Sequence, residues 1–333
     1  MTEIPNDLIT RDDIIIDGTC VANYWISAFE QFYEGGFNAQ IVSLLGVGDI
    51  RDGIDAYRAM NRFIRDNPKK IQKVSSINDI INAKKNDKIA VIYHMQGAEN
   101  LGTDPDNLEI HYQLGLRVLQ LAYNRRNAWC EGCNEFSQEV GLSKLGIHLI
   151  NECNRLGVIV DGSHTSWRSV IDACEISSSP VICSHSNPYE VYNSNRNISD
   201  EVIYAIADTE GVIGINAFPT SVSAKRPITS DIFIKHFTYV SDLVGPEFIS
   251  IGLDYYFRNF GLDIYQNMIK MGYWTEELYP EIPPWTWPQG IDDITRAIPN
   301  LALSLYKNGF SRRDIQGILG GNLLRVFRQA WKN

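Results

Sequence analysis

The feature that most constrains the fold of this chain is an alternation of short apolar runs with amphipathic segments of helix length. Eight apolar runs recur along the 333 residues. Within each run apolarity is continuous, which is typical of strands buried on both faces of a parallel sheet that is covered by helices. The runs lie at residues 14–17, 39–45, 88–94, 117–122, 157–161, 180–183, 211–216 and 248–254.

The segments between the runs have the pattern of crossover helices. Apolar side chains recur at three- and four-residue spacing in 141–156, and Ser199, Ser230 and Ser311 are expected N-caps of later segments. No linker rich in charge, proline or serine divides the chain. The pattern therefore predicts one α/β domain over residues 1–333, a (β/α)8 TIM barrel. The helices are expected at residues 54–65, 79–83, 141–156, 167–177, 201–209, 231–244, 292–308 and 311–332.

The aromatic, proline-rich segment 273–290 (YWTEELYPEIPPWTWPQG) departs from this alternation. It follows the eighth predicted strand and therefore lies at the end of the barrel where active sites of this fold are built. We expect it to form a lid or a pocket wall. A packed connection or a subunit contact is the alternative.

Charge and composition exclude several classes of partner. A net charge of −10 and a pI near 5.1 disfavour nucleic acid and anionic membrane surfaces. The N-terminus has no basic region followed by an apolar run, and the apolar stretches are far shorter than the roughly 20 residues of a membrane span.

Six cysteines in a chain of this length do not indicate a disulfide framework, and the Cys130/Cys133 pair has no second pair with which to bind zinc. We expect a reduced, cytoplasmic protein.

Polar side chains at the carboxyl ends of the predicted strands are the candidates for function. His164 and His185 end neighbouring strands, each directly after a serine, and Asp254 ends the eighth strand. Two imidazoles and a carboxylate that converge on one point suit a divalent, zinc-type cation. We therefore expect all three to be catalytic and to be metal ligands. For a single histidine, a structural hydrogen bond would be the alternative.

At this point the chain resembles a known family, the membrane (renal) dipeptidases, peptidase family M19 of the amidohydrolase superfamily. The resemblance covers nearly the whole sequence and is most specific in its second half. The stretches that carry it are NRLGVIVDGSHTS (154–166), PVICSHSNPYEVYNSNRNISDEVIYAIADTEGVIGINAFP (180–219), IGLDYY (251–256) and GGNLLRVF (320–327).

The resemblance implies a site for two zinc ions, of which this chain retains only part. His164 and His185 match the ligands of one zinc. The other zinc requires a His-x-Asp at the end of the first strand, where residues 19–21 read Thr-Cys-Val. A glutamate bridges both ions in the family, and the matching residue here is the neutral Gln96. Without that anion two dications cannot lie close together, so we expect the second metal site to be lost.

One zinc on His164, His185 and Asp254 remains feasible, since three protein ligands and a water are a common catalytic arrangement. Gln96 could add a weak carbonyl oxygen. Cys20 lies between the missing ligands, but alternation along the strand points its side chain away from the site. The resemblance is to a divergent bacterial branch of the family, which implies a coherent redesign of the site rather than decay.

Further residues match substrate-binding positions of the family. Tyr123 matches a substrate-binding histidine, Arg196 an arginine that binds the substrate carboxylate, and Asp254 the catalytic aspartate. A guanidinium suits that role because it pairs with a carboxylate through two parallel hydrogen bonds. Tyr123 and Asn124 could bind or polarise a substrate carbonyl, and Gln96 is also expected to bind the substrate. His94 lies on the same strand face as Gln96, one layer deeper, and is expected to be a hydrogen-bonding residue of the core.

Three hypotheses about function follow. The first is a dipeptidase-like metallohydrolase that acts on a small amide or peptide-like carboxylate, with one divalent metal ion and Asp254 as general base. The second is a lyase or isomerase that uses the same pocket on an amino-acid-like metabolite. The third is a non-catalytic binding protein, which costly buried polar clusters disfavour. A small molecule is the expected partner, and a homodimer is possible because the family commonly forms dimers.

Overall fold

The computed structural model describes residues 8–45, 48, 50–135, 139–255 and 262–332. The predicted single domain over 1–333 therefore includes ranges outside the described residues, as does Tyr256 of the IGLDYY motif. Within the described ranges, eight parallel strands follow one another around a barrel in the order β7-β6-β5-β4-β2-β1-β9-β8. They are β1 (Ile16–Val21), β2 (Ala39–Leu45), β4 (Ile89–Gln96), β5 (Leu116–Gln120), β6 (Ile159–Asp161), β7 (Val181–Ile182), β8 (Ile213–Asn216) and β9 (Ile249–Gly252).

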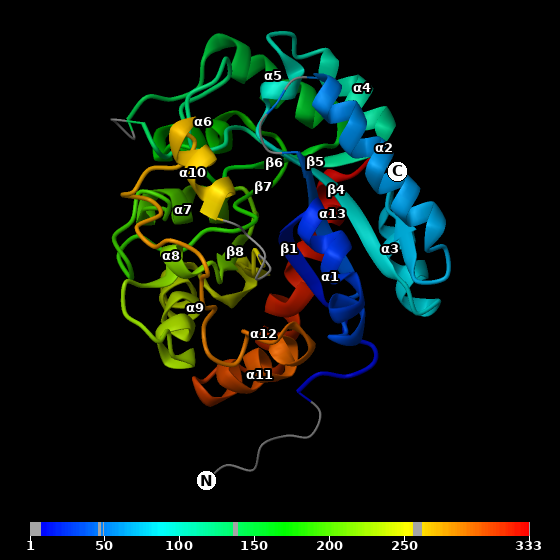
Figure 1. Ribbon diagram of the computed structural model, residues 1–333, viewed down its shortest axis with the longest axis vertical. Coiled ribbons are helices and arrows are strands. Elements are labelled where there is room, and N and C mark those ends of the chain that lie inside the picture. Colours follow the sequence, from blue (N-terminus) through cyan, green and yellow to red (C-terminus); the bar gives the residue numbers. More distant parts are fainter. Residues whose placement is uncertain (1–7, 46–47, 49, 136–138, 256–261, 333) are drawn as a thin grey trace.

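The barrel closes between β7 and β8, the strands at the two ends of this order. A parallel bridge joins Cys183, directly after β7, to Ile213 of β8. Gly214 approaches Ser184 so closely that an added Cβ would lie 1.9 Å from the Ser184 carbonyl oxygen, which explains a glycine at this seam. All eight predicted strands are present, and the TIM-barrel prediction is confirmed (Figure 1). An additional strand, β3 (Ile71–Lys73), pairs with β4 outside the ring and was not predicted.

Helices follow the strands and cover the barrel. Every segment expected to be helical contains a helix, whereas α1, α4, α8 and α10 were not expected. The helices are α1 (Ala22–Glu34), α2 (Ile50–Asp66), α3 (Ile77–Lys85), α4 (Asn107–Leu114), α5 (Lys144–Leu156), α6 (Trp167–Ile176), α7 (Asp200–Asp208), α8 (Pro219–Val222), α9 (Ser230–Val244), α10 (Leu262–Lys270), α11 (Ile294–Lys307), α12 (Arg312–Gln316) and α13 (Asn322–Ala330), with short 3₁₀ turns at Glu99–Leu101 and Pro246–Phe248 and a π-helical turn at Gly317–Gly321.

The three serines that were expected to be N-caps differ in their positions and hydrogen bonds. The Ser311 hydroxyl accepts a hydrogen bond from the Asp314 backbone N–H and forms a full capping box, as expected. Ser199 occupies the N-cap position of α7, although its side chain caps no backbone N–H. The prediction for Ser230 is wrong, because it is already the first helical residue of α9. The preceding Thr229 is extended and its hydroxyl accepts from the helix backbone instead.

The end of the barrel opposite the site is closed by an apolar layer. This layer is one buried cluster formed by the first halves of the strands and by α13. It contains Ile16, Ile41 and Ile92 from the strands, and Leu323 and Phe327 from the helix. The C-terminal helix therefore covers the amino ends of the strands. The polar side chains that are candidates for function lie at the carboxyl ends of the strands, as in other barrels of this kind.

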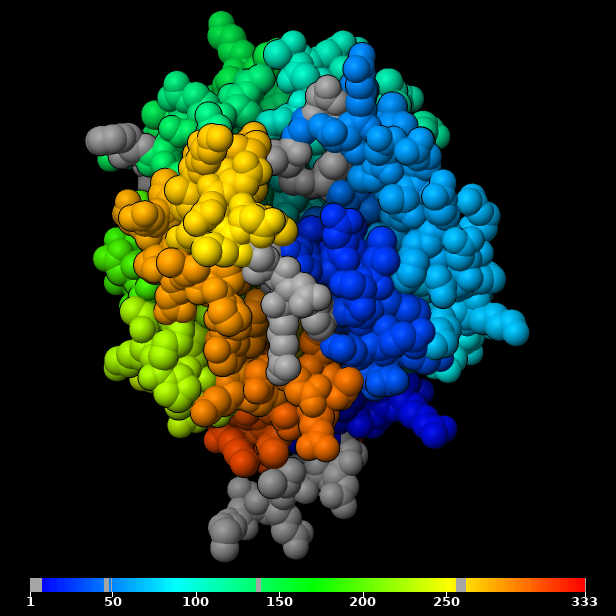
Figure 2. Space-filling model, in the orientation of Figure 1, coloured from blue at the N-terminus to red at the C-terminus, as the bar shows by residue number. Residues whose placement is uncertain are grey.

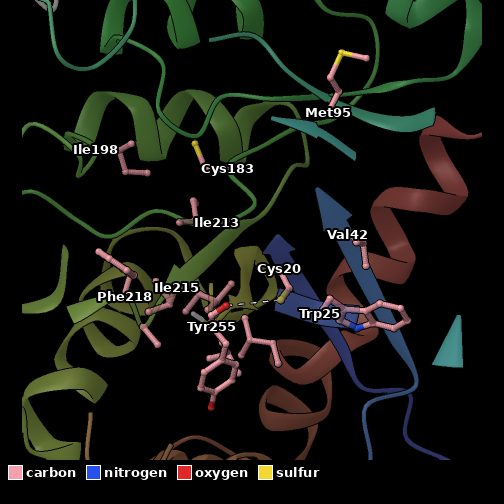
Figure 3. Packing of buried hydrophobic residues seen from close by; sticks show 14 of the residues in the cluster. Cys20, Trp25, Val42, Met95, Cys183, Ile198, Ile213, Ile215, Phe218 and Tyr255 are labelled. Carbon is pink, nitrogen blue, oxygen red and sulfur yellow. Dashed lines mark hydrogen bonds between the residues drawn. The ribbon is translucent and has the colours of Figure 1, made fainter. Parts of the chain in front are cut away.

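The side chain of Cys20 points out of the barrel, in agreement with the alternation along β1. It is fully buried in the larger apolar cluster between barrel and helices, with Trp25 and Tyr255 (Figure 3). Its thiol contacts the Tyr255 backbone carbonyl at 3.7 Å, and burial raises its pKa well above the usual value. A neutral thiol that faces the helices is not a substitute metal ligand.

Candidate active site

Two histidines meet at the carboxyl ends of neighbouring strands. His164 follows β6 and His185 follows β7, and their Nε2 atoms lie 2.9 Å apart. Both side chains are almost completely buried. Gln96, the last residue of β4, places its side-chain Nε2 3.1 Å from Nε2 of His185 and 3.5 Å from Nε2 of His164. The structure thus brings together the three side chains that the sequence placed at the ends of these strands.

Hydrogen-bond partners on the far side of each ring indicate which nitrogen carries the proton. His164 Nδ1 lies 2.5 Å from the Asn124 side-chain oxygen, which can only accept, so Nδ1 carries the hydrogen. His185 Nδ1 lies 2.7 Å from the Ser184 hydroxyl, whose own hydrogen is donated to the Asp161 carboxylate. In both rings Nε2 is therefore left with a free lone pair. This is the arrangement of metal-binding histidines, in which the second nitrogen donates to a fixed acceptor.

Both imidazoles are neutral. Burial lowers the pKa of His164 and of His185 well below the usual value, and the nearby Arg196 guanidinium lowers them further. Two neutral lone pairs that face each other repel unless a donor or a cation lies between them. The Gln96 amide supplies that donor in this structure, and a cation would serve equally well.

Arg196 and Asp254 supply the charges of the site. Arg196 is buried and donates to the His185 backbone oxygen at 2.8 Å and to the Ser186 hydroxyl at 3.2 Å. Burial raises the pKa of Asp254 to about 6, while the Arg196 charge and a hydrogen bond with Asn216 act in the opposite direction. Oδ1 of Asp254 is buried and has no hydrogen-bond partner among the described residues. A carboxylate with one free oxygen and a pKa near neutrality is suited to general-base catalysis.

Three site residues have unusual backbone conformations. Asn124, His164 and Asp254 have φ angles of 62°, 63° and 51°, in the left-handed region that is uncommon outside glycine. Such conformations cost free energy and cluster at functional sites, where they point a side chain in a direction that regular structure does not allow. All three lie just after a strand of the barrel, at its functional end.

A narrow pocket lies above these groups, with space for about one water molecule between its walls. Segment 273–290 supplies part of the wall through Trp274 and Tyr279, and Figure 2 shows that segment (orange) on the surface next to α10 (yellow). The Trp274 indole N–H donates to the Tyr123 hydroxyl at 2.9 Å. The lining residues are Gln96, Tyr123, His164, Arg196, Asn216, Phe218, Ser221, Asp254, Trp274 and Tyr279.

Of the predicted site residues, Asn124 and His185 do not line this pocket. Both are completely buried. No role was expected for Asp161, Asn216 or Trp274. Asn216 bonds to Asp254 and Trp274 to Tyr123, whereas Asp161 accepts from Ser184, which in turn contacts His185. The one available signal was the position of Asp161 at the end of its strand, three residues before His164.

A layer of buried, hydrogen-bonded polar side chains lies deeper in the barrel than the two histidines. His94 Nδ1 lies 2.7 Å from the Ser43 hydroxyl, and its Nε2 lies 3.2 Å from the Asp161 carboxylate. The prediction that His94 is a hydrogen-bonding residue of the core is confirmed. Asp161 also accepts the backbone N–H groups of Ser163 and Ser184, both at 2.9 Å. Hydrogen bonds and the His94 charge hold the pKa of Asp161 well below its usual range.

Thr19 and Gln96 occupy positions at which the resemblance implies ligands of a second cation. Thr19 faces the barrel interior, where its hydroxyl lies 3.3 Å from that of Ser43. Among the described residues, no group of three or more His, Cys, Asp or Glu side chains lies close enough together to hold a metal ion. The donors that do converge are the two imidazoles of His164 and His185 and the Gln96 amide. For His164, His185 and Asp254 to bind one cation, as predicted, the Asp254 carboxylate must lie close to the two imidazoles.

The six cysteines are buried thiols, as expected for a chain without a disulfide framework. Cys130 and Cys133 do not form a metal site with other described residues. The Cys133 thiol instead lies 3.2 Å from the Asn124 side-chain oxygen, behind His164.

A closed parallel barrel with paired histidines and an aspartate at its carboxyl end defines the fold as a (β/α)8 barrel of the metal-dependent hydrolase type. The chain matches the model of the membrane dipeptidase family (peptidase family M19) over residues 17–278. It therefore belongs to the membrane dipeptidase family, as its sequence motifs predicted.

Individual relatives agree with this assignment. The chain is 27% identical over 326 residues to Dipeptidase 3 of Mus musculus, a match that covers 96% of this chain and 58% of the mouse protein. An amidohydrolase from Pseudomonas aeruginosa superimposes with a TM-score of 0.88 at 30% identity, covering 96% of this chain and 97% of that one. A metallopeptidase from Rhodobacter sphaeroides, solved with a phosphinate mimic of the dipeptide L-Ala-D-Ala, has the same fold, with a TM-score of 0.79, 19% identity and coverage of 96% and 100%.

Among the helices of the described residues, none combines the length and the apolar character that crossing a membrane demands.

Proposed function

We propose that this chain is a dipeptidase-like hydrolase that cleaves the amide bond of a small substrate with a free carboxylate. The observation that carries the proposal is the convergence of two neutral imidazoles, whose free Nε2 atoms lie 2.9 Å apart, with the Asp254 carboxylate and the Arg196 guanidinium beside one narrow pocket. Membership of a family whose relatives are named dipeptidases supports the same class of reaction.

We propose that one divalent cation, of zinc type, binds at His164 and His185. Their donor nitrogens fit this ion, because two nitrogens on one tetrahedral zinc lie about 3.3 Å apart when each Zn–N bond is about 2 Å. The Gln96 amide would turn its oxygen toward the cation, and Asp254 completes the predicted set of protein ligands. When bound, the cation polarises the scissile carbonyl or lowers the pKa of a water molecule. A second cation is not proposed, since Thr19 and Gln96 carry no anionic donor.

The chain's own residues have distinct tasks in this reaction. Arg196 binds the substrate carboxylate, since a guanidinium forms two parallel hydrogen bonds to that group. The free Oδ1 of Asp254 accepts a proton from the attacking water. Burial raises the pKa of Tyr123 well above its usual value, so its hydroxyl stays protonated. Because it already accepts from Trp274, that hydroxyl directs its own hydrogen to a substrate carbonyl.

Hydrolysis of a panel of dipeptides tests this proposal. The wild-type protein, loaded with zinc, should release free amino acids, and Asp254→Asn should lose at least about a hundredfold in kcat. Asp55→Asn, on the exposed surface of α2, is the matched control and should keep wild-type activity. Unchanged turnover in Asp254→Asn would remove this residue from the mechanism.

A second candidate is acid–base chemistry without hydrolysis, a lyase or isomerase step on an amino-acid-like metabolite. It is favoured by Gln96, which bridges the two imidazoles through its amide and so can stabilise the site without a metal. Turnover of such a metabolite after complete chelation would favour this candidate. The lid role of segment 273–290, the homodimer and the cytoplasmic location remain predictions.

A further inference from the structure

Asn124 connects the histidine site to segment 273–290. It follows β5 and is completely buried. Its side-chain oxygen accepts from His164 Nδ1 at 2.5 Å and lies 3.2 Å from the Cys133 thiol. Its side-chain nitrogen donates to the Tyr273 backbone oxygen at 2.9 Å and lies 3.3 Å from the Tyr279 hydroxyl. Both ends of this amide are therefore occupied by protein groups, and neither is offered to a substrate.

The Tyr273 carbonyl fixes which way the amide points. If the amide were rotated by half a turn, its oxygen would face the Tyr273 oxygen, and two acceptors at this part-buried contact would be left without a hydrogen between them. Two acceptors that face each other without a hydrogen destabilise the rotated orientation. The rotated amide would also present its N–H to His164 Nδ1 and would favour the tautomer that carries its hydrogen on Nε2. That tautomer has no lone pair to offer on the side of His185.

We propose that Asn124 is a positioning residue that couples segment 273–290 to the proton position of His164, and through it to cation binding. With the segment in place, the Tyr273 carbonyl orients the amide, the amide oxygen holds the hydrogen on His164 Nδ1, and Nε2 is free to bind a cation. With the segment displaced, the amide is free to rotate and the cation ligand is lost. The inference rests on the proposed cation site at His164 and His185, and it replaces the expected contact of Asn124 with substrate.

The coupling acts in both directions. A cation that binds the Nδ1–H tautomer favours the amide orientation that holds Tyr273, so metal binding must stabilise segment 273–290 by the same free energy by which that segment stabilises metal binding. Groups that orient metal-binding histidines contribute about 10- to 100-fold in metal affinity. The pocket wall would thus be ordered in the metal-loaded state, when the site is ready for substrate.

Two substitutions of Asn124 separate the role of its side-chain oxygen from the role of its side-chain nitrogen. Asn124→Leu removes both the acceptor for His164 and the donor to Tyr273. Asn124→Asp keeps acceptor oxygens and removes the donor. The control is Thr275→Val, which removes two other hydrogen bonds of the segment: the 3.1 Å bond from the Thr275 hydroxyl to Asn134 and the 3.3 Å bond that this hydroxyl accepts from the Leu278 N–H.

The first measurement is the tautomer of His164 in the metal-free protein, from long-range ¹H–¹⁵N correlations assigned with a His164→Gln variant. We expect an Nδ1–H ring in the wild type and in Thr275→Val, and a substantial Nε2–H population in Asn124→Leu, together with zinc affinity about 10- to 100-fold weaker. An Nε2–H ring in the wild type would overturn the inference. So would an unchanged tautomer and unchanged zinc affinity in Asn124→Leu.

The second measurement is backbone hydrogen exchange of residues 273–279 with and without zinc. Zinc should slow exchange in the wild type and should have no such effect in Asn124→Asp, which retains an acceptor oxygen for His164 Nδ1. Equal slowing in both proteins would overturn the coupling. Neither readout depends on turnover, so a protein that shows the coupling but hydrolyses no dipeptide would refute the proposed function alone.

Discussion

Replacement of Asp161 by asparagine tests whether the buried polar layer supports the site. The Asp161 carboxylate accepts hydrogen bonds from two backbone N–H groups at 2.9 Å and from the Ser184 hydroxyl. It also lies 3.2 Å from His94 Nε2. An asparagine keeps the shape and can still accept the backbone groups, but it turns an N–H donor toward the Ser184 hydroxyl or toward His94. A hydrogen bond to a charged group contributes about 1.5–3 kcal/mol, and we expect a loss of this size for Asp161→Asn, which gives up at least one such bond.

The sign of the pH dependence follows from the lowered pKa of Asp161. A carboxyl group whose pKa is lower in the folded than in the unfolded state stabilises the fold above its unfolded pKa, and this stabilisation is lost as the pH falls toward the folded pKa. The difference between wild type and Asp161→Asn should therefore be constant from pH 8 to about pH 5. It should shrink by about 1 kcal/mol on going to pH 3.

Urea unfolding monitored by circular dichroism at several pH values is the assay. Asp55→Asn, which breaks an exposed 3.1 Å ion pair with Arg58 on α2, is the control and should cost less than about 0.5 kcal/mol. A free energy of unfolding for Asp161→Asn within 1 kcal/mol of the wild type would refute the reasoning. A difference that grows as the pH falls would also refute it.

Two further predictions concern the reaction. Because a general base must be deprotonated and the pKa of Asp254 is raised to about 6, kcat/KM for a dipeptide should fall as the pH drops below about 6, by up to tenfold per pH unit; a flat profile from pH 5 to 8 would contradict this role. Arg196→Lys keeps the positive charge but loses the planar pair of donors, so KM for a dipeptide should rise by about tenfold or more, while the dipeptide amide, which has no carboxylate, should be little affected. An equal rise for both substrates would show that Arg196 does not recognise the carboxylate.

The barrel itself could be predicted from the sequence because continuous apolar runs and amphipathic segments determine which faces are buried. The missing elements have physical reasons. β3 comprises only Ile71, Gln72 and Lys73, too short and too polar to give a periodic signal. Helix α1 starts at Ala22, directly after β1, with no capping side chain or turn residue to mark the change.

The site was predictable only in part. His164, His185 and Gln96 come together because strand ends meet at one end of a barrel, and strand ends are visible in a sequence. The task of Asn124 was not predictable, since it depends on a left-handed backbone and on the Tyr273 carbonyl, 149 residues further along the chain. The proton positions of the two imidazoles likewise depend on tertiary partners that no local pattern reveals.

The most direct test of the central claim is the metal content of the protein. The chain should be expressed without added metal, purified and analysed for bound metals by mass spectrometry, next to a His164→Gln/His185→Gln double variant. We expect about one zinc-type ion per wild-type chain and none in the double variant. Two ions per chain, or one ion that the double variant retains, would contradict it.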